Sequence, residues 1–246
     1  MPLISVVMSV YNSSLFLKEC IKSILEQTFK DYELIILDDG SSDNSIDIIK
    51  TFSDTRIKFI ACQHDYIQTL NMGINMTKGK YIAHMDSDDI MLPNRLEVEY
   101  KFMEENQNID VCGSNIGEVD NPSYCSNIDT QHKEIVSKLV LGCTLFHPTV
   151  IIRKSSIQKT FFENGQFHLY NPDYIYAEDY KLWVDMLING FIFGGIKEKL
   201  VNKRVSDRQI TNIHKEEVYK QAKKVQIDIA EYVEKIIRES NNPKLI

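Results

Sequence analysis

Apolar runs of strand length alternate with helical segments through the first hundred residues, and this alternation limits the possible folds more than any other feature. Leu3 to Val10 is almost continuously apolar, as expected for a parallel strand that is covered on both faces. From Ser14 to Leu25 apolar residues recur at helical spacing, and Tyr32 to Leu37 returns to strand character. This order predicts a βαβ unit.

The same order then repeats. The expected elements are a helix over residues 46–52, a strand over Ile57–Ala61, a helix over Thr69–Met76, a strand over Lys80–Met85 and a helix that starts at Pro93. Strands that alternate with helices predict an α/β fold with a mainly parallel sheet flanked by helices. Because such sheets bind ligands at the carboxyl ends of their strands, the chemistry should lie in the loops that follow these strands.

Beyond about residue 117 the alternation stops. After a polar, turn-rich segment the sequence predicts a short helix over Ile135–Leu141, a strand over Thr149–Arg153 and a helix over Ala177–Asn189 that Gly190 ends. An amphipathic stripe over Ile213–Ile237 then predicts a long helix. We therefore expect one domain with a C-terminal helical extension over residues 212–246.

The charge balance and the cysteines exclude several classes of protein. The 246 residues include 28 Lys and Arg against 35 Asp and Glu, a net charge of −7, which makes nucleic acid an unexpected partner. The five cysteines form no Cys-x-x-Cys pair, and no apolar run approaches the roughly 18 residues of a membrane span. These features predict a cytoplasmic protein, at most peripheral to a membrane.

The loops after the first two strands carry candidate nucleotide contacts. The chain has no Gly-x-Gly-x-x-Gly and no Gly-Lys-Ser/Thr, which excludes the usual dinucleotide and NTPase loops. Tyr11 either stacks on a base or fills the strand end. Asp43 has an ordinary explanation as a helix N-cap. Asp39 has none, and it is placed to accept a hydrogen bond from a base or a ribose hydroxyl.

Three carboxylates, Asp86, Asp88 and Asp89, follow the strand over Lys80–Met85. Carboxylates this close repel one another unless a cation lies among them, and Mg²⁺ or Mn²⁺ prefers such oxygen ligands together with substrate phosphates. The pattern indicates a metal–diphosphate site. A solvated acidic turn before the next helix is the alternative.

Glu178 and Asp179 open a later predicted helix. Interaction with the helix dipole would account for Glu178 fully. The functional alternative is a general base, which must be a carboxylate separate from the metal ligands. Trp183, one helical turn later, either packs in the core, which we favour, or stacks on an acceptor sugar.

Seven blocks of sequence together resemble the family 2 glycosyltransferases of the GT-A fold. They are Ile4–Asn12, Ser23–Phe29, Asp38–Asp43, Gly79–Asp89, Pro93-x-Arg95-Leu96, His147–Arg153 and Ala177–Trp183. Each block is unspecific alone, but their order and ordinary spacing make the resemblance specific from residue 3 to about residue 211.

The resemblance implies a GT-A fold with a Rossmann-like nucleotide-binding half. It also implies an inverting, non-processive transfer from a nucleotide-diphosphate sugar, with UDP expected, to a glycan, lipid-linked or protein-linked hydroxyl. Within a catalytic domain over residues 1–211, residues 1–117 would bind the nucleotide sugar and residues 118–211 the acceptor. The implied site residues are Ser9, Tyr11, Asp39 and Asp86 for the nucleotide sugar, Asp88 for Mn²⁺ or Mg²⁺, and Asp179 as general base.

The chain departs from the family pattern at two informative places. His84 stands where related sequences often have arginine, and Lys203-Arg-Val-Ser206 keeps Arg204 but loses a histidine. These departures concern phosphate and acceptor contacts. Selectivity for the donor sugar, the acceptor and the linkage is expected in the segments 118–142 and 156–173.

Two other functions compete with a glycosyltransferase. A non-catalytic sugar-nucleotide- or glycan-binding module would keep the fold, but it has no need of a base such as Asp179. A nucleotidyltransferase on a related fold is disfavoured by the missing glycine-rich loop.

The C-terminal stripe carries six basic and six acidic residues between Ile213 and Glu239. A helix that binds a membrane surface would have a basic polar face. The mixed charge therefore favours packing against the catalytic domain, or against a second copy in a homo-oligomer, over a lipid surface.

Overall fold

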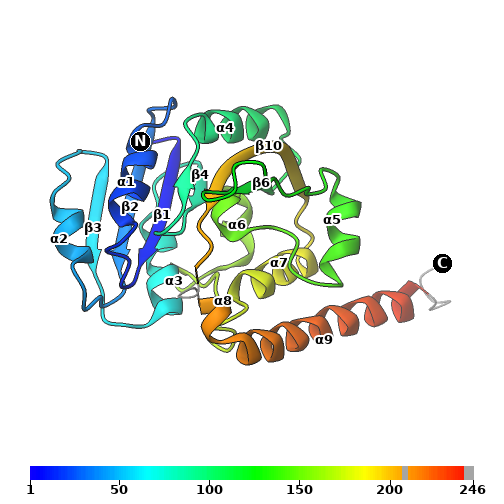
Figure 1. Cartoon of the computed structure of the whole chain (residues 1–246). Coiled ribbons are helices and arrows are strands. Elements are labelled where there is room, and N and C mark those ends of the chain that lie inside the picture. Colours follow the sequence, from blue (N-terminus) through cyan, green and yellow to red (C-terminus); the bar gives the residue numbers. More distant parts are fainter. Residues whose placement is uncertain (207–209, 241–246) are drawn as a thin grey trace.

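The computed structural model describes residues 1–206 and 210–240, and Figure 1 shows a central sheet with helices on both faces. The elements of the first half are β1 Ile4–Val10, α1 Leu17–Leu25, β2 Tyr32–Asp38, α2 Ser45–Lys50, β3 Ile57–Ala61, α3 Tyr66–Met76, β4 Tyr81–His84, β5 Ile90–Met91, α4 Arg95–Glu105 and β6 Val111–Glu118. Those of the second half are α5 His132–Leu139, the 3₁₀ turn η1 His147–Thr149, β7 Ile151–Arg153, α6 Lys154–Thr160, the hairpin β8 Phe162–Glu163 and β9 Gln166–Phe167, α7 Glu178–Ile188, β10 Phe193–Lys203, α8 Ile210–Ile213 and α9 Lys215–Ser240.

The main sheet has the strand order β3-β2-β1-β4-β7-β6-β10-β5. β3, β2, β1 and β4 are parallel, as the βαβ pattern predicts. β7 runs antiparallel to both β4 and β6, β10 is parallel to β6, and β5 pairs antiparallel with β10. The predicted α/β fold with a mainly parallel sheet is therefore confirmed, with antiparallel pairing confined to the second half.

Two hydrophobic cores cover the two faces of the sheet. Successive side chains of a strand point to opposite faces, so Val7 joins the core under α3 and α7 while Val6 and Met8 join the core under α1 and α4. All three side chains are fully buried. This explains why β1 is an unbroken apolar run and does not alternate with polar residues.

Two inner strands of the sheet, β6 and β10, escape sequence analysis. β6 reads VCGSNIGE and is buried over its first seven residues, including Ser114 and Asn115. β10 begins with Phe-Gly-Gly, and its pairing with β6 shifts register between Ile196 and Lys199 and again before Val201. Glycines, buried polar residues and an irregular register hide the period of two on which strand prediction depends.

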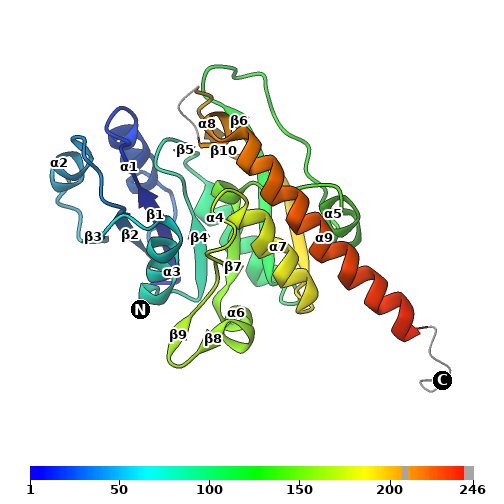
Figure 2. The ribbon, with the colours of Figure 1, turned by 90° about the horizontal axis from the view of Figure 1, so that it is seen from below.

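The C-terminal helix α9 packs along α7, as both ribbon views show, and its last turns extend away from the rest of the chain (Figures 1 and 2). Val225 and Ile229 of α9 are fully buried in the core that contains α7. Lys181 forms an ion pair of 3.0 Å with Asp228. The expected packing of the tail against its own domain is thus confirmed, while the homo-oligomer and the domain boundaries stay predictions.

Part of the tail prediction cannot be compared with the structure. The side chains of Ile236, Ile237 and Glu239, and residues 241–246, lie outside the described residues. Within the described part, no helix combines the length and apolarity needed to cross a bilayer.

Candidate functional site

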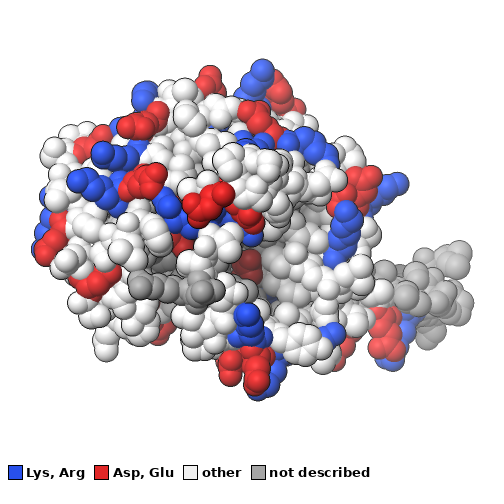
Figure 3. Space-filling model, viewed as in Figure 1, with Lys and Arg blue, Asp and Glu red and all other residues white. Residues whose placement is uncertain are grey.

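The carboxyl ends of β1, β2 and β4 lie together at one edge of the sheet, because Val10 is paired with Asp38 and Val7 with His84. Ser9 lies one residue before the end of β1, paired with Leu37 and partly buried. On the face shown in Figure 3, basic residues are interspersed with acidic ones, and acidic residues also lie in a hollow near the centre of the view. The loops that follow these strands carry most of the residues predicted from sequence.

Asp39 is almost fully buried and is held by hydrogen bonds. Its Oδ1 accepts from the Asp65 N–H at 2.8 Å and from Thr69 Oγ1 at 2.7 Å, and its Oδ2 lies 2.9 Å from His64 Nδ1. The inference that Asp39 lacks a structural role is therefore wrong, since it anchors the start of α3. A carboxylate has about four acceptor sites, so these contacts leave capacity for one further donor.

Tyr11 does not fill the strand end. Its side chain is 48% exposed, and its ring stacks on that of His64 with centroids 4.4 Å apart. Gly40, which lies in the turn after β2, has a φ of +76°, a backbone conformation that favours glycine. Tyr11 and His64 thus form an exposed aromatic surface directly beside Asp39, and His64 is a candidate residue that sequence analysis missed.

The three carboxylates in the acidic loop after β4 have three different environments. Asp89 is buried, and its Oδ1 accepts from the Arg204 N–H at 2.9 Å, which ties this loop to the end of β10. The Asp86 side chain is 40% exposed, and Asp88 is partly buried. Burial and the charge of Asp86 raise the pKa of Asp88 to about 6. A divalent cation would relieve this repulsion, so the carboxylate oxygens fit a hard metal ion.

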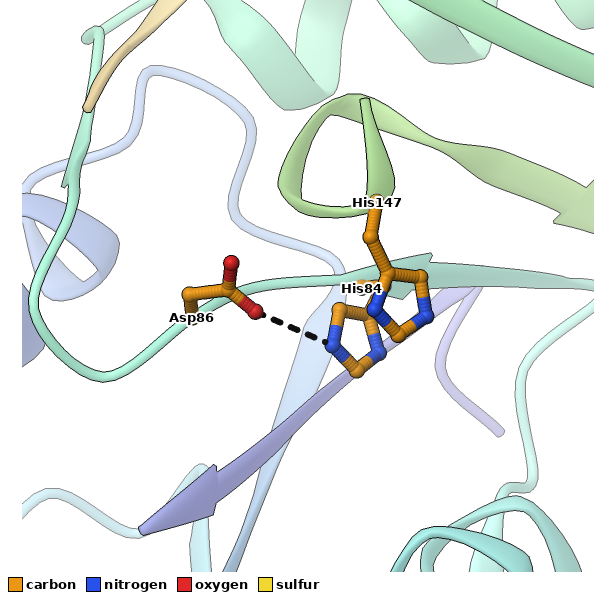
Figure 4. Close-up of side chains that lie close together, drawn as sticks. All are labelled: His84, Asp86 and His147. Carbon is orange, nitrogen blue, oxygen red and sulfur yellow. Dashed lines mark ion pairs between the residues drawn. The ribbon is translucent and has the colours of Figure 1, made fainter. Parts of the chain in front are cut away.

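His84 and His147 lie beside Asp86 and come from β4 and η1 (Figure 4). The two rings stack with centroids 3.5 Å apart and planes 16° from parallel, and His84 Nε2 lies 3.4 Å from Asp86 Oδ1. One ligand atom from each of the three residues falls within 4.8 Å of the others. Imidazole binds metals through lone pairs in the ring plane, so stacked rings do not direct both nitrogens at one ion.

Both histidines are therefore better described as a neutral pair. Burial and nearby Arg95 lower the pKa of His84 to about 3, and burial lowers that of His147. His147 Nε2 lies 2.8 Å from the hydroxyl oxygen of Tyr170, whereas neither ring nitrogen of His84 has a hydrogen-bond partner within the described residues. His84 thus offers an unpartnered polar ring next to Asp86.

Arg95 supports the end of β4, where His84 lies and after which the acidic loop begins. Its side chain is fully buried, its Nη2 donates to the His84 carbonyl at 2.9 Å, and its Nε donates to Glu99 Oε1 at 2.8 Å. The second Glu99 oxygen has no hydrogen-bond partner in the described part of the chain, and burial raises the pKa of Glu99. This buried ion pair is therefore a structural support beneath the acidic loop.

We expect Arg95→Met to lower the free energy of unfolding by about 3 kcal/mol, because it leaves Glu99 buried without its partner. Urea denaturation followed by circular dichroism measures this change. The double variant with Glu99→Leu should recover much of the loss, since both charges are then removed. Equal losses in the single and double variants would contradict the ion pair as the cause.

The second acidic pair lies at the start of α7. Asp179 Oδ1 accepts from the Tyr180 N–H at 2.6 Å, and Cys143 Sγ donates to Asp179 Oδ2 at 3.5 Å. Glu178 Oε1 accepts from the Tyr66 hydroxyl at 3.0 Å. Burial raises the pKa of Asp179 to about 6, and burial together with Asp179 raises that of Glu178 to about 8. The two neighbouring carboxyls repel each other when charged, so ionisation of one disfavours ionisation of the other.

Trp183 is fully buried, and its Nε1 donates to the Leu145 carbonyl at 3.3 Å. The favoured core position is confirmed, and stacking on an acceptor sugar is not supported. His147 and Pro148 are buried in η1, with the His147 ring against the His84 ring. η1 thus packs against His84, the residue that lies next to Asp86.

Sequence comparisons match the chain to known transferases. A family model described as glycosyl transferase family 2 matches residues 5–175. An uncharacterised glycosyltransferase of Haemophilus influenzae is 31% identical over 247 residues, which cover 96% of this chain and 76% of the relative. WfgD of Escherichia coli, named as a UDP-Glc:α-D-GlcNAc-diphosphoundecaprenol β-1,3-glucosyltransferase, is 30% identical over 189 residues, 75% of this chain and 70% of WfgD.

Solved structures share the fold. Residues 1–349 of S. aureus TarS, solved in complex with UDP-GlcNAc, align with a TM-score of 0.70 at 17% identity over 92% of this chain and 65% of that one. The mannosyltransferase PcManGT of Pyrobaculum calidifontis, solved with GDP-Man and Mn²⁺, aligns with a TM-score of 0.63 at 13% identity over 84% and 58%. This chain spans less than two thirds of either, and at these identities the likeness concerns the fold alone.

Proposed function

The chain belongs to glycosyl transferase family 2, and we propose that it transfers one sugar from a nucleotide-diphosphate sugar to an acceptor hydroxyl with inversion. One observation carries this proposal. His84 Nε2 lies 3.4 Å from Asp86 Oδ1, the His84 ring stacks on that of His147, and the His147 ring centroid lies 6.1 Å from that of Trp183 on α7. These contacts join the acidic loop to the helix that begins with the candidate base, so both belong to one site. The donor sugar would lie between them.

The residues at the strand ends would bind the donor. Tyr11 has an exposed ring that would stack on the base, Ser9 and Asp39 would help to hold the nucleotide, and Asp86 would contact the ribose and sugar. Asp88 would hold Mn²⁺ or Mg²⁺ through its carboxylate. When bound, such an ion neutralises the charge that develops on the departing nucleoside diphosphate.

Asp179 would act as general base. Its ionised carboxylate accepts the proton of an acceptor hydroxyl while that oxygen forms the new bond to the anomeric carbon and the bond to the diphosphate breaks on the opposite face. Because the charges of Glu178 and Asp179 repel each other, one ionised carboxylate is favoured at this position, and we assign it to Asp179. The raised pKa of Asp179 makes it a stronger base than an exposed aspartate.

The pH dependence of turnover follows from these pKa values. The base works only when it is deprotonated, so kcat/KM at saturating Mn²⁺ should be lost as the pH falls through about 6, the raised pKa of Asp179. Above this value the profile should reach a plateau. Steady-state kinetics between pH 5 and 8 would measure it, and an acidic limb near the usual aspartate value of about 4 would contradict the assignment.

The relatives indicate substrates to test first. The name of WfgD specifies a UDP-sugar donor and a lipid-linked diphosphate acceptor, and TarS was solved with UDP-GlcNAc. We propose the same classes here: a UDP-sugar as donor and a lipid-linked glycan as acceptor. The strand-end carboxylates and the candidate base Asp179 support this proposal.

A panel of UDP-, GDP- and dTDP-sugars tests this function. The purified protein is incubated with each donor, with Mn²⁺ or with EDTA, and the released nucleoside diphosphate is measured with and without lipid-linked glycan acceptors. We expect Mn²⁺-dependent release from at least one UDP-sugar, stimulated by an acceptor. Donor binding without release under any condition would instead favour the non-catalytic binding module.

A further inference from the structure

A cavity of about 410 Å³ lies between the end of α5, the start of α7 and the first half of α9, beside Asp179. Figure 2 shows α9 running beside α7. Its lining includes Leu141, Cys143, Tyr180, Tyr219, Ala222 and Gln226. The volume falls in the range of small-molecule sites. The cavity thus combines the candidate base with a wall from the C-terminal helix.

Hydrogen bonds hold the first half of α9 against the segments that line the rest of the cavity. Gln226 Nε2 donates to the Leu141 carbonyl at 2.6 Å, across the cavity from α9 to the end of α5. Gln221 Oε1 accepts from the Tyr176 N–H at 2.7 Å, and Asp228 Oδ2 accepts from the Tyr174 hydroxyl at 2.9 Å. The first half of α9 is therefore positioned as part of the site, in contrast to its extended last turns.

The lining chemistry selects the type of ligand. Tyr219 is 64% exposed and Leu141 is 77% exposed, so both present apolar surface to whatever enters. The charged and amide groups of the lining are the Asp179 carboxylate, the Lys223 ammonium and the Gln226 amide, and three lining tyrosines add hydroxyl groups: Tyr176, Tyr180 and Tyr219. A pyranose ring matches this arrangement because it has apolar C–H faces for an aromatic ring and hydroxyls along its edge.

We propose that α9 forms one wall of the acceptor subsite, with the Tyr219 ring against the acceptor sugar and the sugar's nucleophilic hydroxyl directed at Asp179. This inference rests on the proposed function and names the acceptor part of its site. The family match ends at residue 175, so the wall comes from outside the matched region. Acceptor selection is thereby assigned to α9 as well as to the end of the segment 118–142.

The other segment expected to select the acceptor has a different position. Residues 156–173 contain the β8–β9 hairpin, which packs against α3: Asn75 Oδ1 accepts from the Phe167 N–H at 2.6 Å, and Asn71 Oδ1 accepts from the Tyr170 N–H at 2.9 Å. This segment contributes no residue to the cavity lining.

Kinetics of two α9 variants test the proposal. Tyr219→Ala should raise the acceptor KM by about tenfold or more, the effect of losing an aromatic contact at the centre of a recognition site. Tyr219→Phe should keep the acceptor KM within about twofold of the parent, because the ring remains. Tyr232→Ala, a matched change on α9 outside the cavity lining, should leave the acceptor KM unchanged. Hydrolysis of the UDP-sugar without acceptor should be the same in all four proteins.

The outcomes separate this inference from the proposed function. An unchanged acceptor KM in Tyr219→Ala, with normal donor hydrolysis and thermal stability, would overturn the role of α9 and leave the transferase intact. An equal rise in Tyr232→Ala would overturn it too, since the effect would then be a general one on the helix. If the parent neither hydrolyses nor transfers any sugar nucleotide, the proposed function itself fails.

Discussion

Replacing Asp88 with alanine is expected to abolish turnover together with the Mn²⁺ dependence of donor binding. The substitution removes the Asp88 carboxylate, which we propose as an oxygen ligand for the metal. Burial and the charge of Asp86 raise the pKa of this carboxyl, which a bound cation would counteract. The charge of the diphosphate is then left without its main counter-charge. Calorimetric titration of UDP with Mn²⁺ and with EDTA measures the binding part of this effect.

Asp89→Asn is the matched control for Asp88→Ala. Asp89 is adjacent, but its Oδ1 accepts from the Arg204 N–H, and an asparagine oxygen can still accept that bond. UDP binding by this control should keep its Mn²⁺ dependence. If Asp88→Ala bound UDP with the same Mn²⁺ dependence as the parent, the metal assignment would be wrong.

Replacing Asp179 with asparagine is expected to lower turnover by about 10²–10⁴, the usual contribution of a positioned acid–base group, while UDP binding stays close to that of the parent. The asparagine keeps the size of the side chain and an oxygen that can accept the Tyr180 N–H, but it cannot take a proton. Binding and chemistry should therefore separate. Single-turnover kinetics and calorimetry measure the two parts independently.

Glu178→Gln is the matched control for Asp179→Asn. Glu178 accepts a hydrogen bond from the Tyr66 hydroxyl, and the oxygen of a glutamine amide can preserve this contact. Its turnover should fall far less than that of Asp179→Asn. A larger loss in Glu178→Gln would transfer the role of base to Glu178, and loss of UDP binding in Asp179→Asn would make Asp179 a donor-site or folding residue.

The sequence predicts the first half of the fold because three of its strands, β1, β2 and β4, are buried on both faces and are therefore mostly apolar. β3 has the predicted bounds, β1 and β2 differ from them by one residue each, and Gly190 follows α7 with a φ of +79° that suits a helix end. The antiparallel insertion of β7 between β4 and β6 has no local signal. Strand direction there depends on contacts between residues that are far apart in the chain.

The candidate site likewise contains residues that the sequence reveals and residues that only the fold brings together. The runs Asp86–Asp89 and Glu178–Asp179 are visible in the sequence because acidic residues cluster at the ends or beginnings of elements. The pairing of Tyr11 with His64, and that of His84 with His147, joins residues from different loops and could not be predicted from spacing. His84 was visible only as a departure from the family pattern, and the structure places it beside Asp86.

The stereochemistry of the product tests the central claim most directly. With an α-linked UDP-sugar accepted by the parent, proton NMR of the first product formed gives the configuration at the transferred anomeric carbon. Direct displacement by a hydroxyl that Asp179 deprotonates predicts a β-linked product. An α-linked product would show retention and would contradict a single displacement between the acidic loop at Asp86–Asp88 and the base at Asp179.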